Sequence, residues 1–264
     1  MEPPARTQVA EMHSRGGGDS TRMLEDHPQT TTKGRPGMRQ TLIFDADDTL
    51  WENNIYFKRV VDDFLDWVAH PTLQRDQIRA MLNDVEAANI GSHGYGTTAF
   101  LHNLGECLER LRERPTSDAD RREIEQLATA LISHRLELMP GVVDTLTELA
   151  RRHDLLLLTK GTLEEQQRKI DASGLAGHFR QLHIVAEKDP ATYRRLTSEH
   201  GLSPEVTWMI GNSPKSDISA AREAGLNAVF IPHRHTWELE HSDLDETDRR
   251  VLVLESFPEL VRHF

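Results

Sequence analysis

Hydrophobic and polar residues follow two different periods along this chain, and the change of period marks the elements that it predicts. Short apolar runs that end in polar side chains begin near Thr41, Asp154, Leu182, Val206 and Asn227. Runs of this kind indicate buried strands of a parallel sheet. Between them, apolar residues recur three or four positions apart, which is typical of amphipathic helices. The alternation predicts an α/β fold of three layers, a doubly wound parallel sheet with helices on both faces.

The stretch after the first strand has the helical period alone. Apolar stripes predict four successive helices, interrupted by His70-Pro71, by a glycine-rich loop over 91–96 and by Pro115; Ser117 is the predicted N-cap of the fourth helix, which continues to Leu136. We expect an inserted helical bundle over residues 55–138, and an α/β core over 39–54 and 139–264. Because the bundle follows the first strand, it can lie as a lid over the carboxyl edge of the sheet.

Later segments continue the strand and helix alternation. Predicted helices begin at Pro140, with the proline in the first turn, and cover 163–174, the residues up to Gly201, and 217–224. The strands predicted between them are 154–159, 182–186, 206–210 and 227–231, and a last apolar run covers 251–254. Residues 1–38 are poor in large apolar groups, so we expect a disordered N-terminal tail.

Composition narrows the partners and the compartment. Lysine and arginine number 31 against 43 acidic residues, a net charge of −12, which disfavours nucleic acid as a partner. The single cysteine, Cys107, excludes an internal disulfide and fits a reducing compartment; we expect it in the core. The sequence shows no secretory pattern and no apolar stretch of the roughly 18 residues that a membrane span needs, so we expect a cytoplasmic protein. Monomer and homodimer both stay open.

Candidate chemistry begins directly after the first strand, where Asp45, Asp47 and Asp48 crowd together. A solvated acidic turn is the simplest interpretation, but buried carboxylates at this spacing require a cation. Asp45 and Asp47 leave extended backbone on the same side. The carboxyl ends of parallel strands meet at one edge, so other polar groups should join them there: Thr159-Lys160-Gly161, Lys188, Asn212 and Asp217.

These residue types suit phosphoryl transfer. Asp45, fixed at a strand end, could act as a nucleophile, and Asp47 as a general acid and base. Thr159 with the backbone of Lys160 and Gly161, and the ammonium of Lys188, could hold phosphate oxygens. Asn212 and Asp217 could join Asp45 and a carbonyl of the Asp47 turn in a Mg²⁺ site.

Taken together, the motifs are similar to those of a known family. Asp45-x-Asp47-x-Thr49, Thr159, Lys188 and Gly211-Asn212-Ser213-x-x-x-Asp217 resemble the haloacid dehalogenase superfamily over roughly 40–235. The resemblance implies a Rossmann-like core, a helical C1 cap and Mg²⁺ bound by Asp45, Asp47 and the fourth motif. It also implies Asp45 as nucleophile, Asp47 as acid and base, and Thr159 and Lys188 as phosphate binders.

Two positions depart from the family pattern. Asn212 stands where an aspartate is usual, which removes a charge from the metal site. Lys188-Asp189-Pro190 replaces the usual Lys-Pro, which leaves Lys160 and Lys215 as alternative phosphate-binding lysines.

Other polar residues have plainer interpretations. Asp48 is expected to be a solvated turn residue. His233, His235 and His241 are expected at the surface, because their spacing matches no zinc site. His93 and Tyr95 fall in the glycine-rich loop, where either a role in binding substrate or a plain loop fits.

The sequence thus predicts a Mg²⁺-dependent phosphohydrolase that cleaves a small phosphorylated metabolite through an aspartyl-phosphate on Asp45. A dehalogenase on the same fold is an alternative, which Asp47 disfavours because those enzymes lack an acid there. A catalytically weak regulatory or scaffold protein and phosphoryl transfer to an acceptor other than water are the others.

Overall fold

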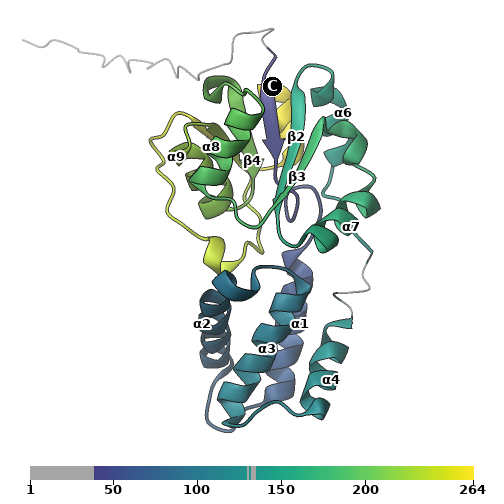
Figure 1. The fold of residues 1–264 in the computed structure, drawn as a ribbon, viewed down its shortest axis with the longest axis vertical. Helices are drawn as coiled ribbons and strands as arrows, with labels where there is room; N and C mark the ends of the chain where they lie inside the picture. Colours follow the sequence, from purple (N-terminus) through teal and green to yellow (C-terminus); the bar gives the residue numbers. More distant parts are fainter. Residues whose placement is uncertain (1–38, 130, 132–134) are drawn as a thin grey trace, which may run out of the picture. The chain divides into compact units, whose positions relative to one another are not determined.

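A parallel sheet forms the centre of the computed structural model, which describes residues 39–129, 131 and 135–264. Its strands are β1 (Thr41–Phe44), β2 (Asp154–Lys160), β3 (Gln181–Val185), β4 (Thr207–Gly211), β5 (Asn227–Phe230) and β6 (Val251–Val253). Across the described residues they form one six-stranded sheet in the order β3-β2-β1-β4-β5-β6, parallel throughout (Figure 1). The predicted α/β class is confirmed, and the last apolar run supplies the sixth strand. The predicted tail, residues 1–38, lies outside the described residues.

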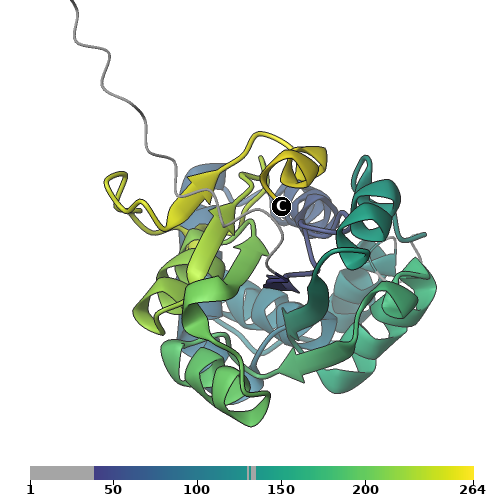
Figure 2. The same cartoon turned by 90° about the horizontal axis from the view of Figure 1, so that it is seen from above.

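Helices cover both faces of the sheet, as Figure 2 shows. Leu42 and Phe44 of β1 pack into a cluster with α6 (Val142–Ala150) and α7 (Leu163–Ser173). Ile43, between them in sequence, points to the other face and packs with α8 (Pro190–Glu199) and α9 (Ala220–Glu223). Since successive side chains of a strand leave on opposite faces, an uninterrupted apolar strand is buried on both. The three predicted layers follow from this burial.

A helical bundle is inserted after β1. Its helices are α1 (Asn54–Val68), α2 (Arg75–His93), α3 (Thr97–Arg112) and α4 (Asp118–Leu127), and their apolar stripes share a buried cluster that includes Phe64, Leu82, Leu104 and Cys107. Cys107 is a core residue, as predicted. Ser117 caps α4: its hydroxyl accepts the N–H of Asp120, and the Asp120 carboxylate accepts the N–H of Ser117. The boundaries of separate domains stay a prediction.

Two element ends within the insert differ from the prediction. α2 runs through Gly91 to His93, and the glycine-rich loop shrinks to Gly94–Gly96, where Gly94 and Gly96 have positive φ. α4 ends at Leu127; after a turn at Ala128, Thr129 and Leu131 are again helical, whereas Arg135 and Leu136 are not, so the predicted single helix to Leu136 is interrupted and ends early. Leu136 packs against the sheet cluster and not against the bundle, so its apolar character reflects a different core.

Two helix starts in the core also differ. α6 begins at Val142 after Gly141, whose φ of 75° places Pro140 outside the helix and not in its first turn. The segment predicted as a helix from Asp217 starts earlier, because a π-helical turn over Pro214–Ser219 precedes α9. Asp217 lies in that turn, and its carboxylate accepts the N–H of Ser213, just after the end of β4 at Gly211.

The chain enters and leaves the helical insert through adjacent backbone. The N–H of Met139 donates to the carbonyl of Leu50 at 2.9 Å, and the N–H of Glu52 donates to the carbonyl of Glu137 at 2.9 Å. Trp51 and Leu138 form an antiparallel bridge between these bonds. Among the described residues, no helix combines the length and the apolar character that crossing a membrane requires.

Candidate active site at the carboxyl edge of the sheet

Asp45 lies directly after β1, the strand between β2 and β4. Its N–H donates to the carbonyl of Ile210 at 2.9 Å, and the residue is 5% exposed. One carboxylate oxygen lies 2.5 Å from Nζ of Lys188, and the other accepts the hydroxyl of Thr49 at 2.9 Å. These contacts fix both oxygens of Asp45, the geometry that a positioned nucleophile needs.

Lys188 joins Asp45 to Asp217. Its ammonium lies 2.6 Å from Oδ1 of Asp217, which is fully buried, and the second oxygen of Asp217 accepts the N–H of Ser213 at 3.0 Å. Burial by itself would lower the pKa of Lys188, but the two carboxylates outweigh it and raise that pKa. Burial raises the pKa of Asp45, and Asp217 adds to the rise while Lys188 opposes it. One cation between two buried carboxylates leaves an excess of negative charge.

Asn212 approaches the same carboxylate from the end of β4. Its Oδ1 lies 3.3 Å from the hydroxyl of Thr49, the same hydroxyl that donates to Asp45. Its Nδ2 lies 3.5 Å from the hydroxyl of Thr236. The oxygens of Asp45 and Asn212 therefore converge around one small polar group.

Asp47 is held by donors that the sequence motifs do not include. Nε1 of Trp51 donates to it at 2.6 Å, Nε2 of Gln166 at 3.1 Å, and Nζ of Lys169 at 2.9 Å. Burial alone would raise the pKa of Asp47, but Lys169, Gln166 and Trp51 overcome it and lower that pKa. Gln166 and Lys169 are three apart on α7, so they share a face, and this spacing after the second strand was the available signal.

The other predicted phosphate-binding residues have different surroundings. Thr159 is buried, and its hydroxyl donates to Gln166 at 3.2 Å. Gly161 has a φ of 144°, which glycine adopts readily. Lys160 pairs with Glu240, lies 3.6 Å from Glu187 and stacks over the Tyr95 ring, so its charge is already matched. Lys215 is exposed and does not line the cavity at this edge, which leaves Lys188 as the lysine beside Asp45.

Two predictions of surface residues are wrong. Asp48 is 3% exposed, with a left-handed φ of 63°, and its carboxylate accepts the N–H groups of Asn53 and Asn54 at 2.9 and 3.0 Å. It thereby satisfies free N–H groups at the start of α1. Burial raises its pKa to about 8, although those two N–H groups oppose the rise. Sequence alone does not show the left-handed turn that buries this side chain.

The His233 side chain is 7% exposed, and its ring lies between two carboxylates. Nδ1 lies 3.5 Å from Asp48 and Nε2 lies 3.2 Å from Glu52. These three side chains could hold a metal ion, because their ligand atoms lie within 4.8 Å of one another. This group is separate from the Asp45 cluster. His235 and His241 remain at least partly exposed, as predicted.

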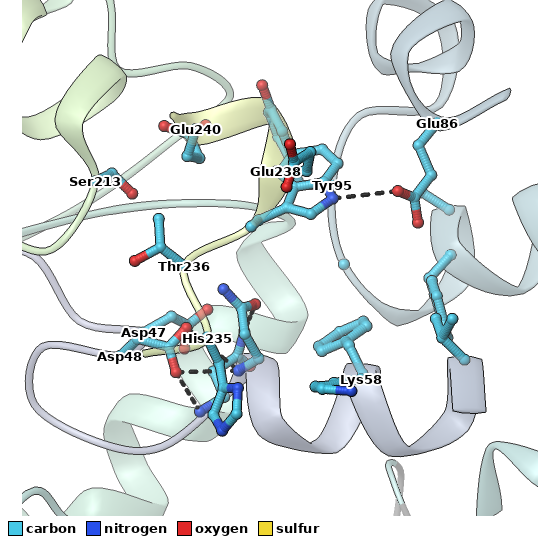
Figure 3. A pocket seen from close by; sticks show the side chains of 18 of the residues that line it. Asp47, Asp48, Lys58, Glu86, Tyr95, Ser213, His235, Thr236, Glu238 and Glu240 are labelled. Atoms are coloured by element: carbon cyan, nitrogen blue, oxygen red, sulfur yellow. Dashed lines mark hydrogen bonds between the residues drawn. The ribbon is translucent and has the colours of Figure 1, made fainter. Parts of the chain in front are cut away.

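A cavity of about 550 Å³ opens onto this cluster. Asp45, Asp47, Lys188 and Asn212 line one end, and side chains from α1, α2 and α3 line the other. The loop after β5 forms part of the wall: Figure 3 shows His235 and Thr236 beside Asp47 and Asp48, with Tyr95 and Glu86 farther along.

Comparisons with known proteins identify the family. A model of the haloacid dehalogenase-like hydrolase family matches residues 40–225. A phosphoserine phosphatase of Thermus thermophilus is 35% identical over 103 residues, 37% of this chain and 41% of that protein. The pyrimidine 5′-nucleotidase PynA of Streptococcus pneumoniae is 25% identical over 74% of this chain and 84% of its own length.

A solved structure resembles the whole described fold. A haloacid dehalogenase-like family hydrolase from Xanthomonas campestris superposes with a TM-score of 0.70 and 27% identity, over 85% of this chain and 95% of the other. Because the superposition covers most of both chains, that hydrolase shares the fold described above.

Proposed function

Because this chain belongs to the haloacid dehalogenase-like hydrolases, and relatives of it are named as phosphatases, we propose that it is a Mg²⁺-dependent phosphatase of small phosphate monoesters. One observation carries the proposal. Asp45 and Asp47 enter the same cavity from the end of β1, and Lys188 lies against Asp45. An anionic nucleophile, a second carboxylate and a buried cation are the groups that phosphoryl transfer requires.

Asp45 attacks phosphorus in this proposal, and the ester oxygen leaves with its electron pair. Lys188 and the hydroxyl of Thr159 stabilise the phosphoryl oxygens as negative charge spreads over them. Lys160, whose charge is matched by Glu240, would hold the wall next to Thr159. The N–H of Gly161, a predicted phosphate donor, donates to the carbonyl of Val185 at 3.0 Å and so belongs to the sheet.

Asp47 delivers a proton to the leaving oxygen and then removes one from the water that hydrolyses the aspartyl-phosphate. This second carboxylate favours a phosphatase over a dehalogenase, because displacement of halide from carbon needs no proton donor for the leaving group. At least one of the two Asp47 oxygens must lose its hydrogen-bond donors before that oxygen can carry a proton.

The donor set fits a magnesium ion. Asp45 and Asn212 present hard oxygen atoms that converge around the Thr49 hydroxyl, and the cluster carries an excess negative charge. We propose Asp45, Asn212 and the backbone carbonyl of Asp47 as the residues that would hold the ion. Asp217, the other predicted ligand, would balance the charge of Lys188, whose Nζ lies 2.6 Å from its Oδ1, while its second oxygen accepts the N–H of Ser213. When bound, Mg²⁺ screens the repulsion between Asp45 and a phosphate dianion.

The helical insert, residues 55–138, would serve as a cap over the cavity. Closure of such a lid excludes water while the ester is cleaved. Several contacts join it to the core: Tyr95 donates to Glu187, the N–H of Thr97 donates to Glu165 at 2.9 Å, and Trp237 donates to Glu86 at 3.1 Å.

Phosphate release from p-nitrophenyl phosphate and a panel of small monoesters, with and without Mg²⁺, tests the proposal. We expect release that requires Mg²⁺, is abolished in Asp45→Asn and is unchanged in Asp84→Asn, since Asp84 is exposed on α2. Release that persists in Asp45→Asn, or that ignores chelation, contradicts the mechanism. No release by the wild type, restored by Asn212→Asp, would show a site weakened at the metal; no release by either would favour a scaffold.

A further inference from the structure

The cavity is larger than phosphate chemistry requires. Its volume of about 550 Å³ lies within the range of sites that enclose ligands of many atoms, roughly 300–1,000 Å³. Only one end contains Asp45 and Lys188. The remainder lies between helices α1–α3 and the loop formed by residues 233–240, and it is available to the alcohol part of a monoester. The inference below, that this part of the cavity selects among phosphate monoesters, rests on the phosphatase activity proposed above.

Hydrogen-bond acceptors mark the wall formed by α2. Asn83 and Glu86 are three residues apart, so they share one face of the helix, and both line the cavity. Oδ1 of Asn83 is buried and has no hydrogen-bond partner among the described residues. A buried polar atom without a partner carries an energetic cost that a ligand donor would remove.

Glu86 is 5% exposed, and its known partners are an indole and a guanidinium. Its Oε2 accepts Nε1 of Trp237 at 3.1 Å, the dashed line that ends at Glu86 in Figure 3, and lies 3.6 Å from Arg79. Because Arg79 balances the charge of Glu86, the wall favours neutral N–H donors and disfavours a second anionic group.

Aromatic rings flank these acceptors. Tyr95 and Trp237 meet edge to face at 6.1 Å, and Phe57 and Phe100 do so at 5.0 Å. All four line the cavity. Aromatic rings pack best against flat groups, whose faces and edges match their own charge distribution. The wall therefore combines surfaces for a planar ring with acceptors for its polar edge.

We propose that this cavity selects phosphate monoesters whose alcohol carries a planar nitrogen heterocycle with N–H donors, and that Asn83 and Glu86 read those donors. Two sources share this chemistry: nucleoside 5′-monophosphates, and other aromatic nitrogen heterocycles with ring or amino N–H groups that carry the phosphate on a side arm. Small alkyl phosphates offer the cavity neither ring nor donor.

The first test measures kcat/KM for phosphate esters of both heterocyclic sources, for glycerol 1-phosphate and for p-nitrophenyl phosphate. We expect the kcat/KM of at least one heterocyclic phosphate to exceed that of glycerol 1-phosphate by about 10-fold or more, because the buried polar groups of the site then find partners on the substrate. For an adenine nucleotide, the analogue that lacks only the amino group should be poorer by about 10-fold. Preference for glycerol 1-phosphate would overturn the inference.

The second test uses Asn83→Leu, which keeps the approximate volume and removes the acceptor. We expect the kcat/KM for the best heterocyclic substrate to fall by about 10-fold, with p-nitrophenyl phosphate hydrolysis unchanged and the exposed control Asp84→Asn unaffected in both assays. Equal losses on both substrates would contradict the inference.

A third measurement keeps the two proposals apart. Calorimetric binding of the dephosphorylated nucleoside or heterocyclic alcohol to the wild-type protein needs no catalysis and no variant. Binding with a wild type that releases no phosphate would retain the subsite and reject the phosphatase. If the wild type releases phosphate but binds no ring and prefers no heterocyclic ester, the phosphatase proposal stands and the subsite is rejected.

Discussion

Replacing Lys188 by methionine would leave two buried carboxylates without their shared cation. Nζ of Lys188 lies 2.5 Å from Asp45 and 2.6 Å from Asp217, and its side chain is 2% exposed. Removal of one partner from a buried ion pair costs about 3–5 kcal/mol, because the remaining charge is neither hydrated nor matched. Typical domains have a free energy of unfolding of about 5–15 kcal/mol, so this loss is large.

The expected result is a fall in the free energy of unfolding of Lys188→Met by about 3–5 kcal/mol at pH 8. At about 2–4 °C per kcal/mol for a protein of this size class, the melting temperature falls by about 6–20 °C. Urea unfolding followed by tryptophan fluorescence, and calorimetry, measure the two quantities. The matched control is Lys215→Met, because Lys215 is an exposed lysine in the π-helical turn Pro214–Ser219; this variant should stay within about 0.5 kcal/mol of wild type.

A double-mutant cycle isolates the contribution of the unpaired charge to the free energy of unfolding. Lys188→Met with Asp217→Asn should be less destabilised than the sum of the single variants, since the amide removes one of the stranded charges. Mg²⁺ should narrow the gap between Lys188→Met and wild type. The reasoning is refuted if Lys188→Met unfolds like Lys215→Met, or if the two changes simply add.

Two further predictions concern the packing at Gly211 and the loss of stability at acid pH. Gly211→Ala should cost about 1–3 kcal/mol, because a Cβ there would lie 2.2 Å from Oδ2 of the immobile Asp217; Gly177→Ala, with nothing within 4 Å, is the control in urea unfolding. Burial would raise the pKa of Glu240, but Lys160 and Ser216 outweigh it and lower that pKa. The stabilisation by Glu240 is therefore complete above its unfolded pKa and is lost as the pH falls through the folded one. Glu240→Gln should be less stable by on the order of 3 kcal/mol at pH 7 and should approach wild type as the pH falls through that lowered folded pKa in urea titrations; a constant gap contradicts this.

The strand-end cluster was accessible from the sequence because one rule of geometry governs it. Parallel strands deliver the residues after them to a common edge, so the positions of Asp45, Lys188 and Asp217 in the chain were sufficient to bring them together. Their roles in catalysis stay predictions. Most strands and helices were also predicted within a few residues, since each is a run of one hydrophobic period.

Contacts that depend on a helix face or a local turn were missed. Lys169 reaches Asp47 from the second turn of α7, where a lysine looks like any surface charge. Asp48 is buried by a backbone turn with φ of 63°, which no pattern of side chains shows. Trp237 bonds Glu86 across 151 positions of sequence, and only the folded chain brings those two together.

The paired backbone beside Trp51 makes the chain modular at that point. The segments around residues 50–52 and 137–139 are hydrogen-bonded to each other, so the chain leaves the core and returns to it at adjacent positions. A segment whose two ends are neighbours can be exchanged for another of any length without moving the sheet. Variation in what these enzymes accept can therefore accumulate in α1–α4 while the strand ends that hold Asp45 keep their positions, and grafting a different bundle at this junction is a direct route to altered specificity.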